Sequence, residues 1–323
     1  MTQTASAEPK KGSALKRSRG GAAGDKVFSN TALAAGVIIL LVLAFVAIFL
    51  VTESLPALWP QVFSDHDSIE SADTFGQYVL PLMGGTVLAS IIALILATPV
   101  AVGIALYISH YAPRKIATPV GYVIDLLAAI PSVVYGAWGM TFLASSMVPI
   151  YGWLHNNLGF IPFFAGDPST TGRTLLTSGV VLAVMILPII TSLCREIFIQ
   201  TPKLHEEAAL ALGATRWEMI KMTVFPFARA GIISSVMLGL GRALGETMAV
   251  TLVLSPGIFS LSLITSGRNA TIPSEIALNF PEAFGMRQSE LIAAGLMLFI
   301  ITLVVNMIAR WIVSRHKEFS GAN

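Results

Sequence analysis

The chain has 323 residues, of which 54% are hydrophobic and only 12% are charged. Soluble domains carry about a quarter charged residues, so this composition excludes a water-soluble globular protein and indicates an integral membrane protein. The net charge of +2 is too small to suggest nucleic acid as a partner. The single cysteine, Cys194, excludes a framework of intramolecular disulfides, and we interpret it as a small apolar side chain near a helix end.

The amino-terminal segment differs in character from the run that follows it. Residues 1–30 are small, polar and basic without hydrophobic periodicity, which predicts a disordered tail. Residues 31–51 are apolar over about 20 positions, enough for a helix to cross ~30 Å of hydrocarbon. No small-residue cleavage site follows, so we expect a retained first span rather than a signal peptide. Together with the acidic loop behind it, this span forms a first region, residues 31–75.

Further apolar runs predict membrane-spanning helices within a core of residues 76–315. They lie near residues 80–108, 116–148, 175–199, 231–254 and 291–312. The first two of these runs are longer than a bilayer requires and contain Pro99 and Pro131, so we expect tilted or kinked helices. Residues 149–173 have room for a short interfacial or re-entrant piece. We therefore predict an all-α polytopic membrane protein of about six spans, with a short tail at residues 316–323.

Basic residues indicate which loops face the cytoplasm, because Lys and Arg concentrate on that side of a membrane. They occur in the amino-terminal tail, at Arg114 and Lys115, between the fourth and fifth spans, and after the last span. The loop after the first span carries acidic residues and no Lys or Arg. We therefore expect both termini to be cytoplasmic.

The loop between the fourth and fifth spans, residues 201–226, has the signals of two short helices. Thr201 is placed to cap the first helix, which begins with a proline, and Gly213 suits the left-handed position after its end. Thr215 and Glu218 have the spacing of a capping box for the second helix. Pro226 is expected to end that helix before the next span. We call residues 201–226 the docking loop.

The first of these helices has the composition of a contact surface. Ala208 and Ala209 are small enough for another protein to approach closely, and Glu206 and Glu207 can pair with basic residues at the rim. We therefore expect these alanines to be exposed to a protein partner. The alternative is an amphipathic loop that lies on the membrane surface.

The docking loop resembles the EAA loop of importer-type ABC transporter permeases. The match consists of Glu-Ala-Ala at 207–209, Gly213 and Pro226; Thr-Val-Phe stands at 223–225, where the family usually has Ile-x-Leu. The resemblance implies a type I ABC importer permease fold, in which residues 203–221 form coupling helices that dock on a separate ATPase. In particular, the resemblance gives this coupling role to Glu207, Ala208, Ala209 and Gly213.

The chain cannot supply the ATPase itself, because no lysine follows a glycine and a phosphate-binding P-loop requires that step. We therefore expect a transport subunit rather than an enzyme, with no cofactor of its own. ATP and Mg would be bound by the partner ATPase.

The stretch GRALGETMAV, residues 241–250, places two charges inside the fifth apolar run. On a single helix over residues 231–254, Arg242 lies near the midplane and Glu246 follows it on the same stripe. A lone arginine there costs about 2.5–3.5 kcal/mol on insertion scales. We therefore expect Glu246 to be its resting counter-ion. One interpretation is a buried ion pair that only fixes helix packing. The other is that Arg242 binds an anion, because a guanidinium forks to two oxygens of a tetrahedral oxyanion.

Glu246 also suggests a basis for selectivity among oxyanions. A carboxylate beside the site can accept a proton from an anion that still carries one, and it repels an anion that does not. Phosphate is partly protonated at neutral pH, and sulfate is not. Glu246 therefore favours phosphate over sulfate.

A second resemblance rests on GRALGETMAV and on AIPSVVYG, residues 129–136. Together they are similar to the PstC-type permeases of phosphate-specific ABC importers, over about residues 76–315 and the first span. The resemblance implies a prokaryotic cell membrane and a phosphate pathway that includes Arg242 and Glu246. It also implies a homologous second permease, two ATP-binding subunits and an extracytoplasmic phosphate-binding protein.

Two other polar residues are weaker candidates for the substrate pathway. Asp125 is ionisable and lies inside an apolar run, although a role in helix packing is equally consistent with its position. Ser132 follows Pro131 and can begin a new helical segment whose N–H groups favour an anion. No spacing of residues suggests a metal site or a catalytic centre. The alternatives are a permease for sulfate or molybdate and an ion-coupled secondary transporter that acts without an ATPase.

Overall fold

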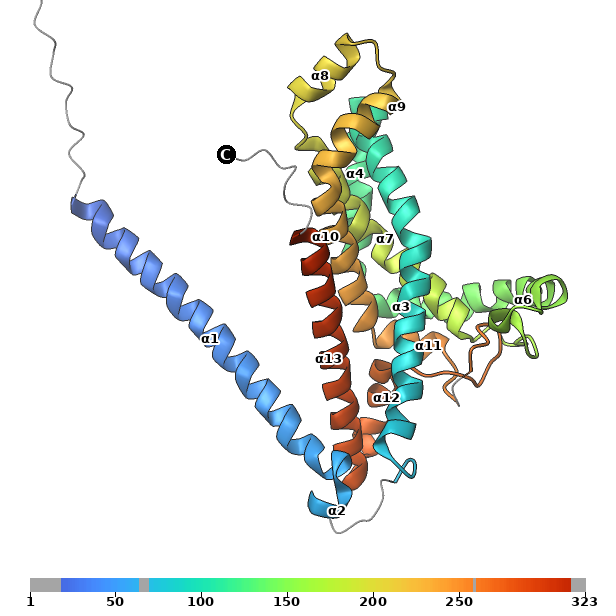
Figure 1. Cartoon of the computed structure of the whole chain (residues 1–323). Coiled ribbons are helices and arrows are strands. Elements are labelled where there is room, and N and C mark those ends of the chain that lie inside the picture. The colour runs from blue at the N-terminus through green and yellow to red at the C-terminus, as the bar shows by residue number, and fades with distance from the viewer. Residues whose placement is uncertain (1–18, 64–69, 258–259, 315–323) are drawn as a thin grey trace, which may run out of the picture. The chain divides into compact units, whose positions relative to one another are not determined.

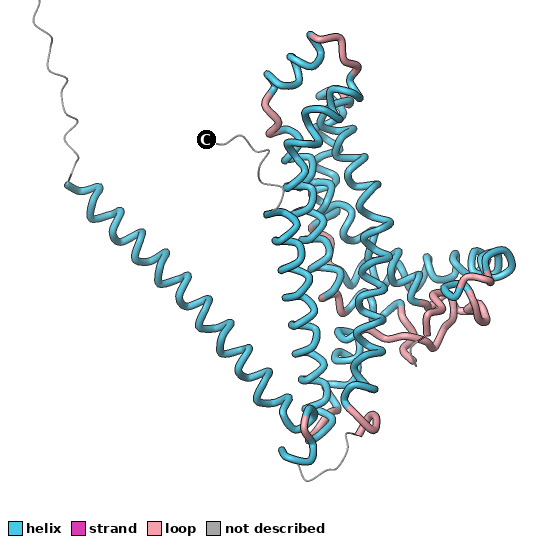
Figure 2. The backbone as a smooth tube through the Cα atoms, in the orientation of Figure 1, coloured by secondary structure: helices cyan, strands magenta, loops and turns pink. Residues whose placement is uncertain are grey.

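The computed structural model describes residues 19–63, 70–257 and 260–314. These residues form helices and connecting loops, with no strand among them (Figure 2). Six helical runs in the described chain are long and apolar enough to cross a membrane. The predicted all-α membrane class and the number of spans are therefore confirmed. Residues 1–18 of the predicted tail and the closing tail, 316–323, lie outside the described residues.

The first span is longer than the apolar run that predicts it. Helix α1 covers Arg19–Leu58, so residues 19–30 are helical and the prediction of an unstructured segment is wrong for them. Once a helix has formed, each added residue gains one hydrogen bond, and this extension needs no apolar side chains. The part of α1 up to Phe49 belongs to a separate unit of the fold, and its apolar side chains are largely exposed.

The second apolar run forms one long helix, and the third is broken. Helix α3 covers Phe75–Leu106 and passes through Pro99 without interruption. The chain then turns away from helical geometry at residues 129–131, so the predicted span 116–148 is wrong as a single helix. Pro131 lacks the N–H that would continue the helix, and its ring disfavours helical geometry at the residue before it. The candidate span that follows is Ser132–Leu158, which includes the whole of α6 (Ala144–Leu158) and enters the segment 149–173.

The remaining helices complete the second unit of the fold. The other helices of the described chain are α2 (Pro60–Phe63), α4 (Arg114–Ala128), α5 (Ser132–Trp138), α6 (Ala144–Leu158), α7 (Leu175–Ile199), α8 (Lys203–Ala211), α9 (Arg216–Met219), α10 (Phe225–Leu244), α11 (Met248–Val253), α12 (Ile272–Asn279) and α13 (Met286–Ser314). Helices α3, α7, α10 and α13 run beside one another, with α8 and α9 near one end and α12 near the other (Figure 1). Short π or 3-10 turns occupy Tyr107–Tyr111, Gly139–Leu143, Pro162–Phe164, Ile220–Val224 and Phe280–Glu282.

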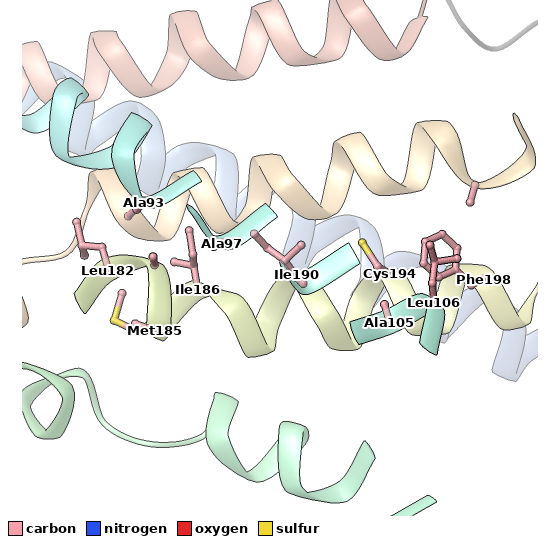
Figure 3. Packing of buried hydrophobic residues seen from close by; sticks show 14 of the residues in the cluster. Ala93, Ala97, Ala105, Leu106, Leu182, Met185, Ile186, Ile190, Cys194 and Phe198 are labelled. Atoms are coloured by element: carbon pink, nitrogen blue, oxygen red, sulfur yellow. The ribbon is translucent and has the colours of Figure 1, made fainter. Parts of the chain in front are cut away.

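The core of this unit is the contact between α3 and α7. One face of α3 carries an alanine at every fourth position, and all of these side chains are at most 1% exposed: Ala89, Ala93, Ala97, Ala101 and Ala105. Residues four apart share a face of a helix, and small side chains let two helices approach closely inside a membrane. Figure 3 shows several of these alanines with Leu182, Ile186 and Ile190 of α7. We call this row the alanine ladder.

The first turns of α3 also hold the start of α12. A Cβ added at Gly85 would lie 2.1 Å from the carbonyl oxygen of Ala270, so only glycine fits there. One residue on, the hydroxyl oxygen of Thr86 accepts the backbone N–H of Ile272 at 2.9 Å. The irregular chain before α12 is therefore fixed against α3 by both steric fit and a buried hydrogen bond.

We expect Gly85→Ala to destabilise the protein and Gly103→Ala to leave its stability equal or higher. Both glycines lie in α3, but no heavy atom approaches the Cβ position at Gly103 within 4 Å. The added methyl group at Gly85 must displace backbone, which typically costs about 1–3 kcal/mol. The thermal unfolding midpoint of the purified protein in detergent measures the difference. Equal midpoints for the two variants would show that the contact with Ala270 is not tightly packed.

Candidate functional site

The fifth apolar run is interrupted at the residues that carry its charges. Helix α10 ends at Leu244, residues 245–247 are not helical, and α11 begins at Met248. The predicted single helix over 231–254 is therefore wrong, and the stripe on which Arg242 and Glu246 were aligned does not continue across the break. Gly245, at the break, lowers the helical preference of the chain. The carboxylate of Glu246 accepts the N–H of Ala249 at 3.2 Å, which favours the start of a new helix.

The break places each of the two charged side chains at one end of a helix. Arg242 lies in the last turn of α10, where the helix dipole is negative, and Glu246 lies before the first turn of α11, where the dipole is positive. Among the described residues, neither side chain takes part in an ion pair. The expected pairing of Arg242 with Glu246 as its counter-ion is therefore not found. Glu246 is 9% exposed, whereas Arg242 is exposed.

Arg242 lines a cavity of about 1030 Å³ between α7, α10 and α13. We call it the central cavity. Its apolar wall includes Ile189 of α7 and Met237 and Leu238 of α10. Its polar lining residues in the described chain are Ser234, Arg242, Asn306, Arg310 and Ser314. The guanidinium group of Arg242 therefore borders an open, partly polar groove between membrane-spanning helices.

The two sequence motifs that were singled out separately meet in the fold. Helix α5, from AIPSVVYG, packs on α11, from GRALGETMAV. A Cβ at Gly136 would lie 2.7 Å from the Cα atom of Ala249, so the two helices are in close backbone contact. Tyr135 donates its hydroxyl hydrogen to the carbonyl of Leu127 at 2.9 Å, which joins α5 to the end of α4. The break after α10 is therefore held in place by the motif around Pro131.

The weaker candidates lie elsewhere or play a different part. Ser132 does begin a new helix after Pro131, as predicted, although its side chain makes no capping hydrogen bond. The carboxylate of Asp125, in α4, lies 4.0 Å from Nη2 of Arg195, in α7. Both residues line a separate cavity of about 350 Å³ together with Arg114. The structure therefore does not bring Asp125 to the central cavity, and its contact joins two helices.

The docking loop has the predicted turn and capping box, with two corrections. Gly213 has a φ of +88°, and Thr215 and Glu218 form both hydrogen bonds of the box. Thr201 does not cap α8: the cap position is Pro202, and the buried hydroxyl of Thr201 has no partner among the described residues. Pro226 does not end the second helix either, because a π turn over Ile220–Val224 links α9 to α10. Pro226 then lies in the first turn of α10, where a missing N–H costs little.

The outer surface of the docking loop is unusually apolar. Leu204 is 75% exposed and Leu212 is 90% exposed, and Trp217 is also exposed. Ala208 is exposed as expected, but Ala209 is only 8% exposed and packs into the hydrophobic core, so its predicted exposure is wrong. Large apolar side chains outside a membrane core mark sites of contact with other proteins.

The comparisons with known proteins identify the family. Residues 87–318 match the binding-protein-dependent transport system inner membrane components. This chain is a member of that family. It is 43% identical over 302 residues to the phosphate transport system permease protein PstC 2 of Mycobacterium tuberculosis, covering 89% of this chain and 91% of the relative. It is 40% identical over 308 residues to the phosphate transport system permease protein PstC of Mesorhizobium japonicum, covering 92% of each.

Two solved structures share the fold of this inner membrane component. A bacterial alginate ABC transporter, in complex with an alginate pentasaccharide-bound periplasmic protein, has a TM-score of 0.62 at 16% identity, covering 91% of this chain and 98% of the other. An inward-facing form of the MetNI methionine ABC transporter has a TM-score of 0.52 at 15% identity, covering 74% and 94%. The described part of the permease is therefore a transport subunit with the ABC importer fold, and it is a multi-pass membrane protein.

The permease also contains an ionic network that was not predicted. Arg287, at the start of α13, lies 2.8 Å from Glu275 of α12 and 2.9 Å from Glu290, and its guanidinium lies over the ring of Tyr78 of α3. Glu290 is fully buried and accepts the backbone N–H of Glu70 at 2.5 Å. The spacing of Arg287 and Glu290 is visible in the sequence, but their partners are far away along the chain. The network joins α3, α12 and α13 at the end of the permease remote from the docking loop.

We expect Glu246→Ala to destabilise the permease and Glu246→Gln to leave its stability nearly unchanged. A glutamine oxygen can still accept the N–H of Ala249, whereas alanine leaves that N–H without its partner at a cost of about 1 kcal/mol. Thermal unfolding of the two purified variants in detergent measures this difference. A large loss of stability in Glu246→Gln would mean that the negative charge, and not the hydrogen bond, holds the start of α11.

Proposed function

We propose that this permease carries inorganic phosphate across the cytoplasmic membrane by alternating access, driven by ATP binding and hydrolysis on partner subunits. The observation that carries the proposal is the guanidinium group of Arg242. It borders the central cavity and has no ion-pair partner among the described residues. An arginine inside a membrane that faces a cavity marks the path of a substrate. The relatives named as phosphate transport permeases support phosphate as that substrate.

The chemistry of Arg242 fits an oxyanion. A guanidinium keeps its charge at any cellular pH and presents paired N–H donors to two oxygens. The negative end of α10 stabilises the arginine when no anion is bound, so it needs no permanent carboxylate partner. A phosphate can therefore bind without first displacing a counter-ion.

Glu246 is the group that we propose distinguishes phosphate from sulfate. One of its carboxylate oxygens accepts the N–H of Ala249, and the other makes no hydrogen bond with the described residues. Glu246 is nearly buried and does not itself line the central cavity, so in this proposal its second oxygen accepts the proton that phosphate still carries at neutral pH when the anion reaches the break after α10. Sulfate has no such proton, so it meets only repulsion. Ser132, at the start of α5, is a further member of the proposed substrate pathway.

The partners follow from the docking loop and from the family. We propose that the exposed residues of α8 bind one of two ATP-binding subunits, which hold ATP and Mg, so that this chain needs no cofactor. A homologous second permease and an extracytoplasmic phosphate-binding protein complete the assembly. The docking loop and both termini then face the cytoplasm. The family description as a component of binding-protein-dependent systems supports this arrangement.

We expect Arg242→Gln to reduce phosphate uptake strongly while the transporter still assembles. A hydrogen bond to a charged group contributes about 1.5–3 kcal/mol, so losing the contact slows uptake by about 10- to 150-fold. Uptake of labelled phosphate by the reconstituted complex measures this loss. Arg229→Gln is the matched control, because Arg229 is an exposed arginine of the same helix that does not line the central cavity. Normal uptake by Arg242→Gln would contradict the proposed role.

We expect Ala208→Trp to prevent stable binding of the ATPase. A large side chain on the exposed face of α8 keeps the two surfaces apart, because a docked interface is packed as densely as a protein interior. Co-purification with the ATPase measures binding, and Ala35→Trp, on the exposed surface of α1, is the control. Full uptake by this variant without any bound ATPase would instead indicate an ion-coupled secondary transporter.

A further inference from the structure

The central cavity is lined by a second arginine, Arg310 of α13. Arg242 and Arg310 come from different helices and border the same space, and both are exposed. None of the described residues that line this cavity is acidic. The cavity therefore has a positive potential with no carboxylate to cancel it, which favours an anion throughout its volume.

The two arginines occupy different depths along the helices. Helix α13 runs from its start near α12 back toward the docking-loop end of the bundle (Figure 1). Leu244 of α10 and Ile301 of α13 belong to one hydrophobic cluster. Arg310 follows Ile301 by about 14 Å at helical rise. Arg310 thus lies between the level of Arg242 and the docking-loop end of the permease.

Most of the side-chain N–H groups around the cavity that make no hydrogen bond belong to Arg242 and Arg310. The guanidinium groups of Arg242 and Arg310 and the amide of Asn306 make no side-chain hydrogen bond or ion pair within the described residues. The hydroxyl groups of Ser234 and Ser314 donate to backbone carbonyls of their own helices instead. At each depth the free donors of one guanidinium group, joined at Arg310 by the amide of Asn306, match the oxygens of a tetrahedral oxyanion.

An arginine at the end of a membrane helix also has an ordinary use, which is to anchor the helix at the cytoplasmic surface. An anchor needs only to reach water or lipid headgroups. Arg310 borders the same cavity as Arg242, one helical turn from Asn306, which also lines it. An anchoring arginine does not need to line the same cavity as Arg242, whereas a second binding position for the same anion does.

We propose that Arg310, with Asn306, is a second phosphate-binding position on the way from Arg242 to the docking-loop side. An anion that leaves Arg242 would otherwise cross a low-dielectric space without a compensating charge. Pores for anions use arginine or lysine, and a series of weak positions lets an ion be bound and still leave. This inference rests on the proposed function, in which phosphate first binds Arg242.

Uptake by Arg310 variants in the complete reconstituted transporter tests the proposal. We expect Arg310→Gln to lower the maximal rate about five- to tenfold, with little change in the KM for external phosphate, because the lost position lies after the first binding step. Arg310→Lys keeps the charge and should retain most of the rate, and Arg229→Gln should transport normally. An unchanged rate in Arg310→Gln, at equal amounts of assembled transporter, would overturn the proposal.

Thiol labelling gives a second readout that anchoring would not affect. The single cysteine of the sequence, Cys194, is buried, and the experiment uses the variant Cys194→Ala as its background. Ser234→Cys, on the cavity wall, should react with an anionic thiosulfonate reagent, and inorganic phosphate should slow that reaction at least about twofold. The slowing should disappear when Arg310→Gln is added. Thr118→Cys, which lines the smaller separate cavity, is the control and should not be protected.

The results separate this proposal from the proposed function. If Arg242→Gln abolishes uptake while Arg310→Gln neither slows uptake nor removes protection, only the second position is wrong. If Arg242→Gln transports phosphate normally, the proposed role of Arg242 fails, and if the unaltered reconstituted transporter takes up no phosphate, the proposed function itself fails. Protection at Ser234→Cys that persists in Arg310→Gln would likewise overturn the role of Arg310.

Discussion

The fold depends on how closely α3 and α7 approach each other. In a bilayer, apolar side chains gain little by leaving lipid for protein, so close packing has to supply the attraction between helices. The alanine ladder provides it by bringing the two backbones together along the length of α3. Helix α10 packs on both of these helices, and α13 packs on α10. The position of Arg242 and the shape of the central cavity therefore follow from a row of methyl groups on another helix.

The break after α10 explains how a charge is tolerated inside this protein. A continuous helix would have needed a carboxylate beside the arginine, and that carboxylate would compete with an incoming anion. Two separate helices instead offer one negative and one positive terminus, and the side chains of Arg242 and Glu246 each lie at the terminus of opposite sign. The arginine is stabilised by a fixed dipole that does not need to move when a ligand binds, which is the condition for a preorganised site.

Much of this architecture could be predicted from the sequence, and the errors have physical causes. Composition and long apolar runs predicted the membrane class and six spans, and the span 175–199 coincides with α7. The break near Gly245 was missed because small and apolar residues continue with helical spacing on both sides of it. The burial of Ala209 and the network of Arg287 depend on residues distant along the chain, and local patterns carry no information about them. The capping box of Thr215 was predicted correctly because it is entirely local.

The interrupted helix also has a consequence for the insertion of the protein into the membrane during translation. Helix α10 has 20 residues, about 30 Å at helical rise, so the break after Leu244 comes as the helix has covered the ~30 Å hydrocarbon thickness. Beyond the break the chain continues through α11, an irregular stretch and α12, and lipid cannot satisfy the polar backbone of such a stretch. Its backbone partners include Thr86 of α3, which accepts the N–H of Ile272, and Phe163, Ser169 and Leu176, which bond the backbone of Leu263 and Ile264; all of them are made earlier during translation. This segment therefore meets these backbone partners in chain that has already left the ribosome.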